Sequence, residues 1–72
     1  MDMTISERIR LLMRRRNKTI GTLAYDIGLS RQSLSAKFRS DNFNLKELKA
    51  IAAALDCDFE EAFIMRDTGE RV

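Results

Sequence analysis

Side chains able to read DNA bases follow one another within residues 31–39. Arg31 and Gln32 stand at the start of this stretch, and each can pair bidentately with one base, Arg with guanine and Gln with adenine. Ser35 and Ala36 follow one helical turn later, where small side chains let a helix sit deep between the phosphate walls. The Ala36 methyl can also touch a thymine methyl. We therefore predict that Arg31, Gln32, Ser35 and Ala36 read base edges in the major groove.

Donors suited to the DNA backbone surround this base-reading set. Lys and Arg neutralise phosphates, and hydroxyl or amide groups donate hydrogen bonds to phosphate oxygens. The predicted phosphate-binding residues are Lys18, Ser33, Lys37, Arg39, Asn42 and Asn44. An arginine run precedes them at Arg8, Arg10, Arg14, Arg15 and Arg16. This run either reaches phosphates beside the groove or forms a solvated helix face, and both interpretations stay open.

Two short helices joined by a tight turn must position these side chains. Thr19 is an N-cap for the first helix, because its hydroxyl can accept a hydrogen bond from an unpaired amide of the first turn. The apolar stripe of that helix is Ile20, Leu23, Ala24 and Ile27. Gly28 ends it, since only Gly enters the left-handed conformation cheaply. Ser30 caps the second helix, whose inner face carries Leu34 and Phe38.

Two further helices are expected, one on either side of this pair. Thr4 or Ser6 caps the earlier helix, which runs to about Arg16. Its apolar stripe is Ile9, Leu12 and Met13. Asn44 caps the later helix, which spans about 45–55. Its buried stripe is expected to be Leu45, Leu48, Ile51, Ala52 and Leu55.

The last stretch of the chain leaves two alternatives open. Asp58 can cap a short final helix, with Phe59, Ala62 and Phe63 turned inward. Alternatively, the apolar run 63–65 pairs back on 70–72 across a turn at 67–69, as a β-hairpin. We favour the strand. Because a lone two-stranded hairpin is marginal in water, we expect residues 59–65 to pair with the same strand of a second chain.

A longer pattern of caps, apolar residues and glycine extends through the middle of the chain. It reads Thr19-x-x-x-Leu23-Ala24-x-x-x-Gly28-Leu29-Ser30-Arg31-x-Ser33-Leu34-Ser35, and continues as Leu45-x-x-Leu48-x-x-Ile51-Ala52-x-Ala54-Leu55. Over residues 5–57 the sequence resembles the Cro/repressor (XRE) family of phage and bacterial regulators. The resemblance implies an all-helical DNA-binding domain that acts as a dimer on a two-fold operator. It places Arg31, Gln32 and Ala36 at base-reading positions and Arg39 near the backbone.

The sequence departs from the family pattern at two positions. The residue after the Thr cap is commonly Gln in the family and helps clamp a phosphate, but here it is Ile20. Lys37 stands where the family has an apolar residue, and Phe38 replaces that residue one step along the chain. The first departure puts the phosphate clamp in question, and the second leaves open the angle at which the recognition helix docks.

The length and the charge of the chain indicate how many domains it has and what kind of partner it binds. The 72 residues suit one small domain, with a core at 5–57 and an extension at 58–72. No apolar run approaches the length of a membrane span, so we expect a cytoplasmic protein that does not bind membranes. Residues 1–50 carry 11 Lys and Arg against 5 Asp and Glu, a net charge of +6, whereas residues 51–72 carry −4. The basic residues 1–50 favour a polyanionic partner. The acidic residues 51–72 favour a segment that stays away from that partner.

Residue types exclude several classes of function. The chain has no His and a single Cys, which removes the usual zinc sites and most general-base chemistry. We expect Cys57 to be a small core residue. Neither a Gly-rich phosphate loop nor a catalytic constellation is present, so we expect no enzyme, no metal, no cofactor and no small-molecule effector.

The sequence as a whole predicts an all-α fold of four to five helices, with a short strand or hairpin as the open question at the end. The predicted function is sequence-specific binding of double-stranded DNA by a homodimeric transcriptional regulator, a repressor of prokaryotic or phage origin, with the recognition helix at about 31–39. The alternative is a protein-interaction module on the same fold, such as an antitoxin-like partner, an anti-repressor or an adaptor. Ile20 and the acidic tail favour that alternative.

Overall fold

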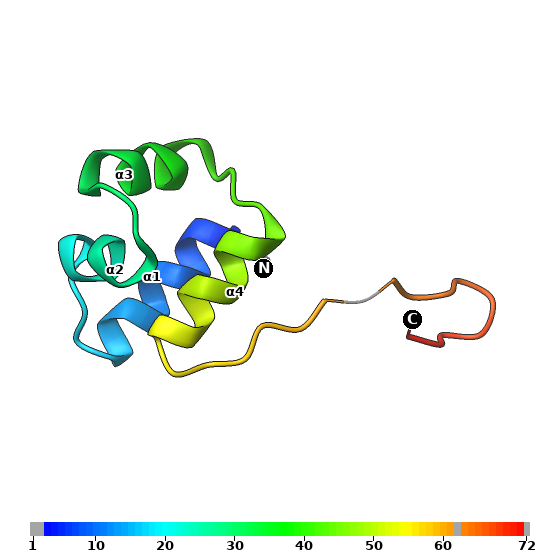
Figure 1. The fold of residues 1–72 in the computed structure, drawn as a ribbon. Helices are drawn as coiled ribbons and strands as arrows, with labels where there is room; N and C mark the ends of the chain where they lie inside the picture. The colour runs from blue at the N-terminus through cyan, green and yellow to red at the C-terminus, as the bar shows by residue number, and fades with distance from the viewer. Residues whose placement is uncertain (1–2, 62, 72) are drawn as a thin grey trace.

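Four α-helices follow one another in the computed structural model, which describes residues 3–61 and 63–71. They are α1 (Ile5–Arg15), α2 (Ile20–Ile27), α3 (Arg31–Ser40) and α4 (Leu45–Ala54), and they pack around one core (Figure 1). The predicted all-α fold is confirmed. Among the described residues, no helix combines the length and the apolar character needed to cross a membrane.

Each helix begins at a side-chain cap. Thr19, Ser30 and Asn44 each accept a hydrogen bond from the backbone N–H three residues further on, as the sequence predicts. At α1 the upstream candidate, Thr4, is the cap. Its hydroxyl accepts from the Glu7 N–H at 3.1 Å, and the Glu7 carboxylate accepts from the Thr4 N–H at 2.8 Å. This reciprocal capping box satisfies two amides that the helix leaves unpaired.

The turn between α2 and α3 depends on Gly28. Its φ of 77° is left-handed, a conformation that a Cβ atom disfavours. The Leu29 N–H donates to the Ala24 carbonyl at 2.9 Å, and the Gly28 N–H donates to the Tyr25 carbonyl at 3.2 Å. These two bonds form a Schellman motif and turn Leu29 back against the core. Ser30 follows directly as the cap of α3, so the connection is as short as predicted.

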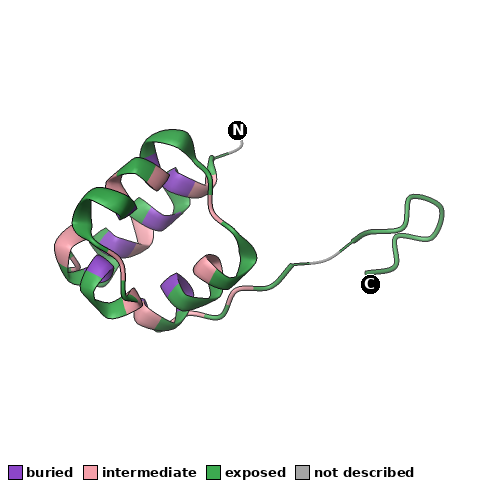
Figure 2. Ribbon diagram, turned by 45° about the horizontal axis from the view of Figure 1, so that its top comes forward, coloured by how far each residue is buried: buried purple, intermediate pink, exposed green. Residues whose placement is uncertain are grey.

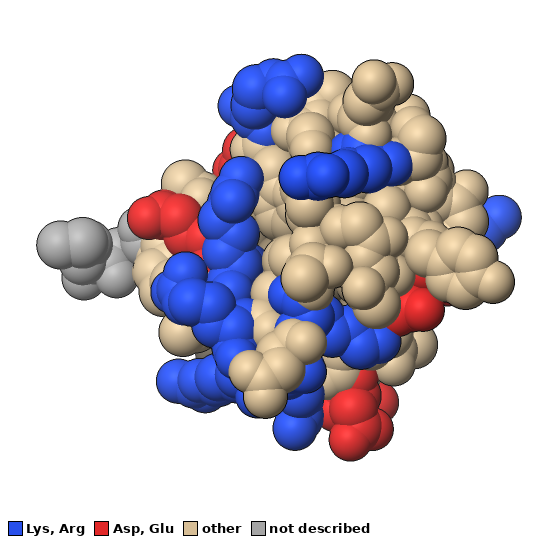
Figure 3. All heavy atoms as spheres, turned by 90° about the vertical axis from the view of Figure 1, so that its left-hand side faces the viewer, with Lys and Arg blue, Asp and Glu red and all other residues tan. Residues whose placement is uncertain are grey.

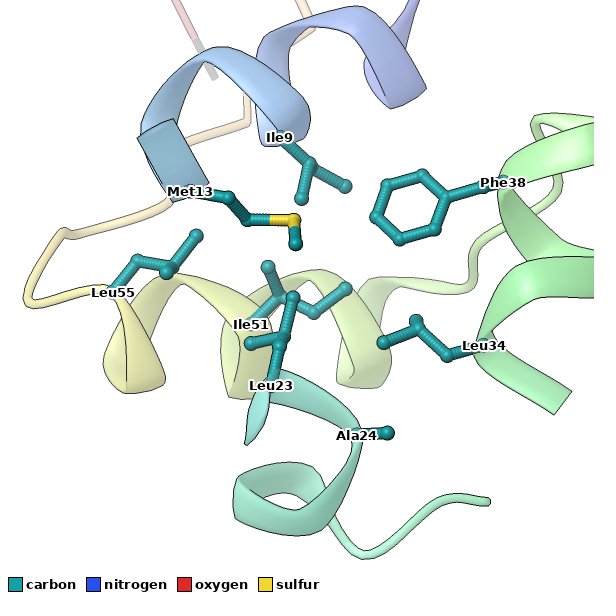
Figure 4. Close-up of a cluster of buried hydrophobic side chains, with 8 residues drawn as sticks. All are labelled: Ile9, Met13, Leu23, Ala24, Leu34, Phe38, Ile51 and Leu55. Carbon is teal, nitrogen blue, oxygen red and sulfur yellow. The ribbon is translucent and has the colours of Figure 1, made fainter. Parts of the chain in front are cut away.

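The core takes two residues from each helical segment. They are Ile9 and Met13, Leu23 and Ala24, Leu34 and Phe38, and Ile51 and Leu55 (Figure 4). Leu34 and Phe38 seat α3 on the other helices, and burying two such side chains contributes on the order of 1.5–3 kcal/mol each. Phe43, in the loop after α3, meets Phe38 edge to face at 5.6 Å between ring centres.

The buried stripe of α4 is shorter than predicted. Leu45 is 37% exposed, because it lies in the first turn and contact with the core starts only at Leu48. Cys57, beyond the helix end, is half-buried and packs against the core, and its Sγ donates to the Leu55 carbonyl at 3.3 Å.

The chain leaves the helices after α4 and runs outward to a hairpin-like turn (Figures 1 and 2). One antiparallel bridge joins Ile64 to Arg71. The Met65 N–H donates to the Glu70 carbonyl at 2.8 Å, and the Gly69 N–H donates to the Met65 carbonyl at the same distance. The predicted β-hairpin is therefore present only as a single bridge with two backbone hydrogen bonds at its turn.

One expectation for this extension is corrected, since within the described residues it does not form the final helix. Its β pairing within the chain is limited to the bridge between Ile64 and Arg71, and pairing of residues 59–65 with a second chain stays a prediction. Phe63 does not turn inward but is 83% exposed. An isolated hairpin gains too little from its own few hydrogen bonds to extend further. Ala62 and Val72 lie outside the described residues.

Candidate nucleic-acid interface

The outer face of α3 brings the predicted base-reading side chains together. Arg31, Gln32, Ser35 and Arg39 line one shallow hollow of about 380 Å³ on its surface. Ala36 is exposed on the same helix but does not line the hollow. Because Leu34 and Phe38 are buried on the opposite side, the helix can turn only this polar face toward a ligand. The face combines bidentate donors with small side chains, as major-groove reading requires.

Ser30 and Ser33 form a small hydrogen-bonded unit at the start of α3. The Ser33 N–H donates to Ser30 Oγ at 3.0 Å, and Ser30 Oγ donates to Ser33 Oγ at 2.9 Å. The Ser33 hydroxyl keeps its own proton for a further acceptor, since a hydroxyl donates one hydrogen bond and accepts two. Its position suits a phosphate contact at the edge of the base-reading face.

Lys37 joins α3 to α4. Its Nζ lies 2.7 Å from a carboxylate oxygen of Glu47, which also belongs to the capping box of α4. Hydrogen bonds from the Lys37 ammonium and from the Asn44 backbone lower the pKa of Glu47 below its ordinary value. This geometry engages the Lys37 ammonium within the protein, and the phosphate contact of Lys37 remains a prediction.

Three cations gather around the start of α2. Arg10, Arg14 and Lys18 line a hollow of about 300 Å³ together with Thr19 and Ile20. The positive end of the helix dipole adds to their field at the first turn. Lys18 also forms an ion pair with Asp26, at Nζ to Oδ2 2.5 Å, so one of these three charges is balanced. The sequence analysis placed Arg10 and Arg14 in the arginine run and Lys18 among the phosphate ligands. The turn after α1, where the Lys18 N–H donates to the Met13 carbonyl at 2.9 Å, keeps all three beside the start of α2.

The arginine run of α1 divides between different tasks. Arg10 lies over the Phe38 ring, with its guanidinium carbon 4.7 Å from the ring centre. Arg16 turns the other way and caps α4. Its Nε donates to the Leu55 carbonyl at 2.8 Å, and a terminal nitrogen donates to the Asp56 carbonyl at 3.2 Å. The guanidinium of Arg16 therefore binds the C-terminal end of α4. The sequence analysis offered only a solvated face or a phosphate contact and did not predict this role.

The loop before α4 carries the last two predicted phosphate ligands. Asn42 is exposed, and its backbone N–H donates to the Lys37 carbonyl at 3.2 Å. Asn44 caps α4, with its side-chain oxygen accepting from the Glu47 N–H at 2.7 Å. The capping role is therefore confirmed, and a phosphate role for either asparagine remains a prediction.

Several Lys and Arg side chains gather at the end of the molecule where α2 and α3 lie (Figure 3). Figure 3 looks onto this end and shows Lys and Arg side chains spread across it, with Asp and Glu side chains toward its margins. The candidate base-reading hollow is lined by residues of α3, and the cationic hollow by residues of α1 and of the start of α2. Such a surface attracts a polyanion. The polar outer face of α3 is exposed on it and can contact that polyanion.

Comparison with known families gives one match. The model of the Cro/C1-type HTH DNA-binding domain matches residues 8–67, which include all four helices except the first turn of α1. No curated protein and no solved structure matches the chain.

Proposed function

The chain belongs to the Cro/C1-type HTH DNA-binding domain family, and on that premise we propose that it regulates transcription by binding a specific sequence of double-stranded DNA. The observation that carries this proposal is the hollow on α3, where Arg31, Gln32, Ser35 and Arg39 stand together on an exposed face. A structural helix of a small bundle does not need such a set of base-matching donors.

In the proposed complex, α3 enters the major groove with its N-terminal residues foremost. Arg31 pairs with guanine O6 and N7, and Gln32 pairs with adenine N6 and N7. Ser35 and Ala36 are small enough to allow close approach of the helix axis to the base edges. Leu34 and Phe38 hold the helix rigidly from behind, which is what a selective contact requires.

Phosphate contacts flank this reading face on both sides. Arg39 lies in the same hollow at the C-terminal end of α3. Arg10, Arg14 and Lys18 offer positive charge at the start of α2, where backbone amides also point outward. Ile20 replaces the Gln that helps to clamp a phosphate in the family. We propose that the positive charge at the start of α2 binds the phosphate in its place. These contacts fix the register of the protein on the duplex without reading sequence.

We further propose that the protein acts as a homodimer on a two-fold operator, with residues 59–65 in the contact between the chains. The dimer doubles the number of bases read and the number of phosphates neutralised. A role as repressor in the cytoplasm of a prokaryote, with the gene in the host or in a phage, is the corresponding biological proposal.

The test is selection from a random duplex DNA library at near-physiological salt, followed by sequencing. We expect enrichment of an inverted repeat with half-sites about one helical turn apart. Enrichment of a single half-site would support the reading face and contradict the dimer. If only salt-sensitive bulk binding were recovered, sequence-specific reading would be wrong, and the interaction module would become the better proposal.

A further inference from the structure

A second apolar surface lies outside the DNA-binding region, between α1 and α4. The two helices and the start of the extension enclose a hollow of about 290 Å³. Its floor includes the half-buried side chains of Ile5, Leu12, Leu48 and Cys57, and Arg8 stands at its edge. No residue of α2 or α3 lines it, so an occupant of this α1–α4 groove would leave the base-reading helix free.

The same chain carries an apolar segment that nothing in its own fold covers. Phe63, Ile64 and Met65 are 83%, 65% and 46% exposed. The hairpin that holds them projects away from the four helices (Figures 1 and 2). Three consecutive exposed apolar side chains on a turn tethered to itself by backbone hydrogen bonds are typical of a contact surface.

From this pairing of groove and segment, we propose that residues 63–65 of a second copy of the chain seat in the α1–α4 groove. This docking rests on the proposed homodimer, and the α1–α4 groove is the surface to which the second copy binds. The exchange is reciprocal, because under two-fold symmetry each copy gives one segment and receives one. The docking is side-chain insertion into a groove, in place of the strand-to-strand pairing expected from the sequence.

The route of the chain favours a second copy over the molecule's own groove. Residues 58–60 line the groove edge and then lead outward without a helix or a turn. The segment from 57 to 63 reaches at most about 20 Å when extended, which is enough to cross to a neighbouring molecule. The chain thus passes from the groove edge to the exposed segment within a few residues. A second molecule placed beside the groove therefore contacts both the groove and the segment.

Charge and area agree with this arrangement. Asp58 and Glu60 line the groove together with Arg8, so acidic side chains stand at its edge, and Arg66 directly follows the docking segment. A phenylalanine buries about 150–250 Å². Two reciprocal contacts of one phenylalanine each, counting segment and groove, thus come to about 600–1,000 Å². Ile64 and Met65 add to this area and bring it toward about 1,200 Å², the lower end for stable interfaces.

Cysteine crosslinking tests the contact directly, because Cys57 lies in the groove and is the only cysteine. The unaltered chain is mixed with a tagged Cys57→Ser/Met65→Cys variant and oxidised. We expect a mixed disulfide between Cys57 and the new cysteine. A Cys57→Ser/Thr22→Cys variant, with its thiol on the exposed side of α2, is the matched control and should give none. A disulfide between two copies of the Met65→Cys variant, without the mixed product, would overturn groove docking in favour of strand pairing. An intramolecular disulfide in a dilute chain holding both cysteines would overturn it in favour of the molecule's own segment.

Sedimentation of two further variants gives an independent readout. Phe63→Glu should convert the dimer to a folded monomer, because Phe63 touches no core residue of its own domain. Tyr25→Glu is the control, since Tyr25 is 85% exposed on α2 and should leave the dimer intact. A dimer that survives Phe63→Glu would contradict the proposal. The duplex selection is scored separately, so an enriched DNA sequence without the Cys57 crosslink refutes the docking and leaves the proposed function standing.

Discussion

The backbone N–H of Ser6, in the first turn of α1, donates a hydrogen bond of 2.7 Å to Oδ1 of Asp41, at the end of α3. Beside it, the buried Ser6 hydroxyl donates to the Phe38 carbonyl at 3.0 Å. Asp41 itself adopts a left-handed φ of 52°, which ends α3. Its carboxylate therefore takes up an amide that α1 leaves unpaired and ties the C-terminal end of the candidate recognition helix to the N-terminal end of α1.

This tie predicts that Asp41 positions α3 for DNA. Asp41→Gly retains the left-handed backbone but removes the acceptor, whereas Asp41→Asn retains both. We expect Asp41→Gly to lower the melting temperature and to weaken binding to the selected duplex several-fold, and Asp41→Asn to restore most of both. Thermal unfolding and duplex titration measure the two effects. Equal affinity of the Gly and Asn variants for the duplex would show that the tie does not orient α3.

Acid should destabilise the protein through three carboxylates. Hydrogen bonding with Thr4 lowers the pKa of Glu7, and hydrogen bonding with Ser6 lowers the pKa of Asp41. The pKa of Glu47 is lowered chiefly by Lys37. Groups with depressed pKa values stabilise the fold fully above their unfolded values, about pH 5 and higher, and lose that contribution as pH falls through the folded values.

Urea unfolding between pH 7 and pH 3 checks this acid dependence. The midpoint should be flat at the upper end and fall below about pH 4. Glu47→Gln should reduce the fall, while Glu61→Gln, on the exposed extension, should not. A midpoint that rises on acidification would contradict the assigned hydrogen bonds.

Gln32 is expected to read one base pair. Gln32→Ala should cost about 1–3 kcal/mol at that position and relax the preference there, since a bidentate contact discriminates by this amount. Affinities for duplexes with each single substitution measure the loss. Lys49→Ala, on the exposed side of α4, is the control. An unchanged base preference in Gln32→Ala would mean that another face of the protein meets the DNA.

Arg14, in the last turn of α1, and Arg16, directly after this helix, should differ in their effects. Arg14→Ala should weaken all duplexes alike and flatten the salt dependence, because each neutralised phosphate contributes about 0.9 to the slope of log K against log salt. Arg16→Ala should leave that slope unchanged and reduce stability by about 1 kcal/mol, because the Leu55 and Asp56 carbonyls lose their donor. Binding isotherms at several salt concentrations, with urea unfolding, separate the two. A flatter slope in Arg16→Ala alone would reverse these assignments.

What the sequence by itself determined is local. Thr19, Ser30 and Asn44 start their helices and Gly28 ends one, because each of these signals depends on hydrogen bonds that span only three to five residues. The exposed face of α3 also follows from the helical period once Leu34 is known to be buried. The helix-turn-helix and the grouping of its candidate base-reading side chains could therefore be predicted.

What the tertiary structure decided is the use of each charged and polar side chain with a distant partner. Lys37 meets Glu47, Arg16 caps α4, and Ser6 meets Asp41, in each case between residues that the fold alone makes neighbours. Periodicity shows which side of a helix faces outward, but not what lies opposite it. An ionic or hydrogen-bonding group far along the chain becomes a partner only when helix packing brings it within bonding distance. That packing decided which basic residues support the fold and which stay available for the proposed DNA contact.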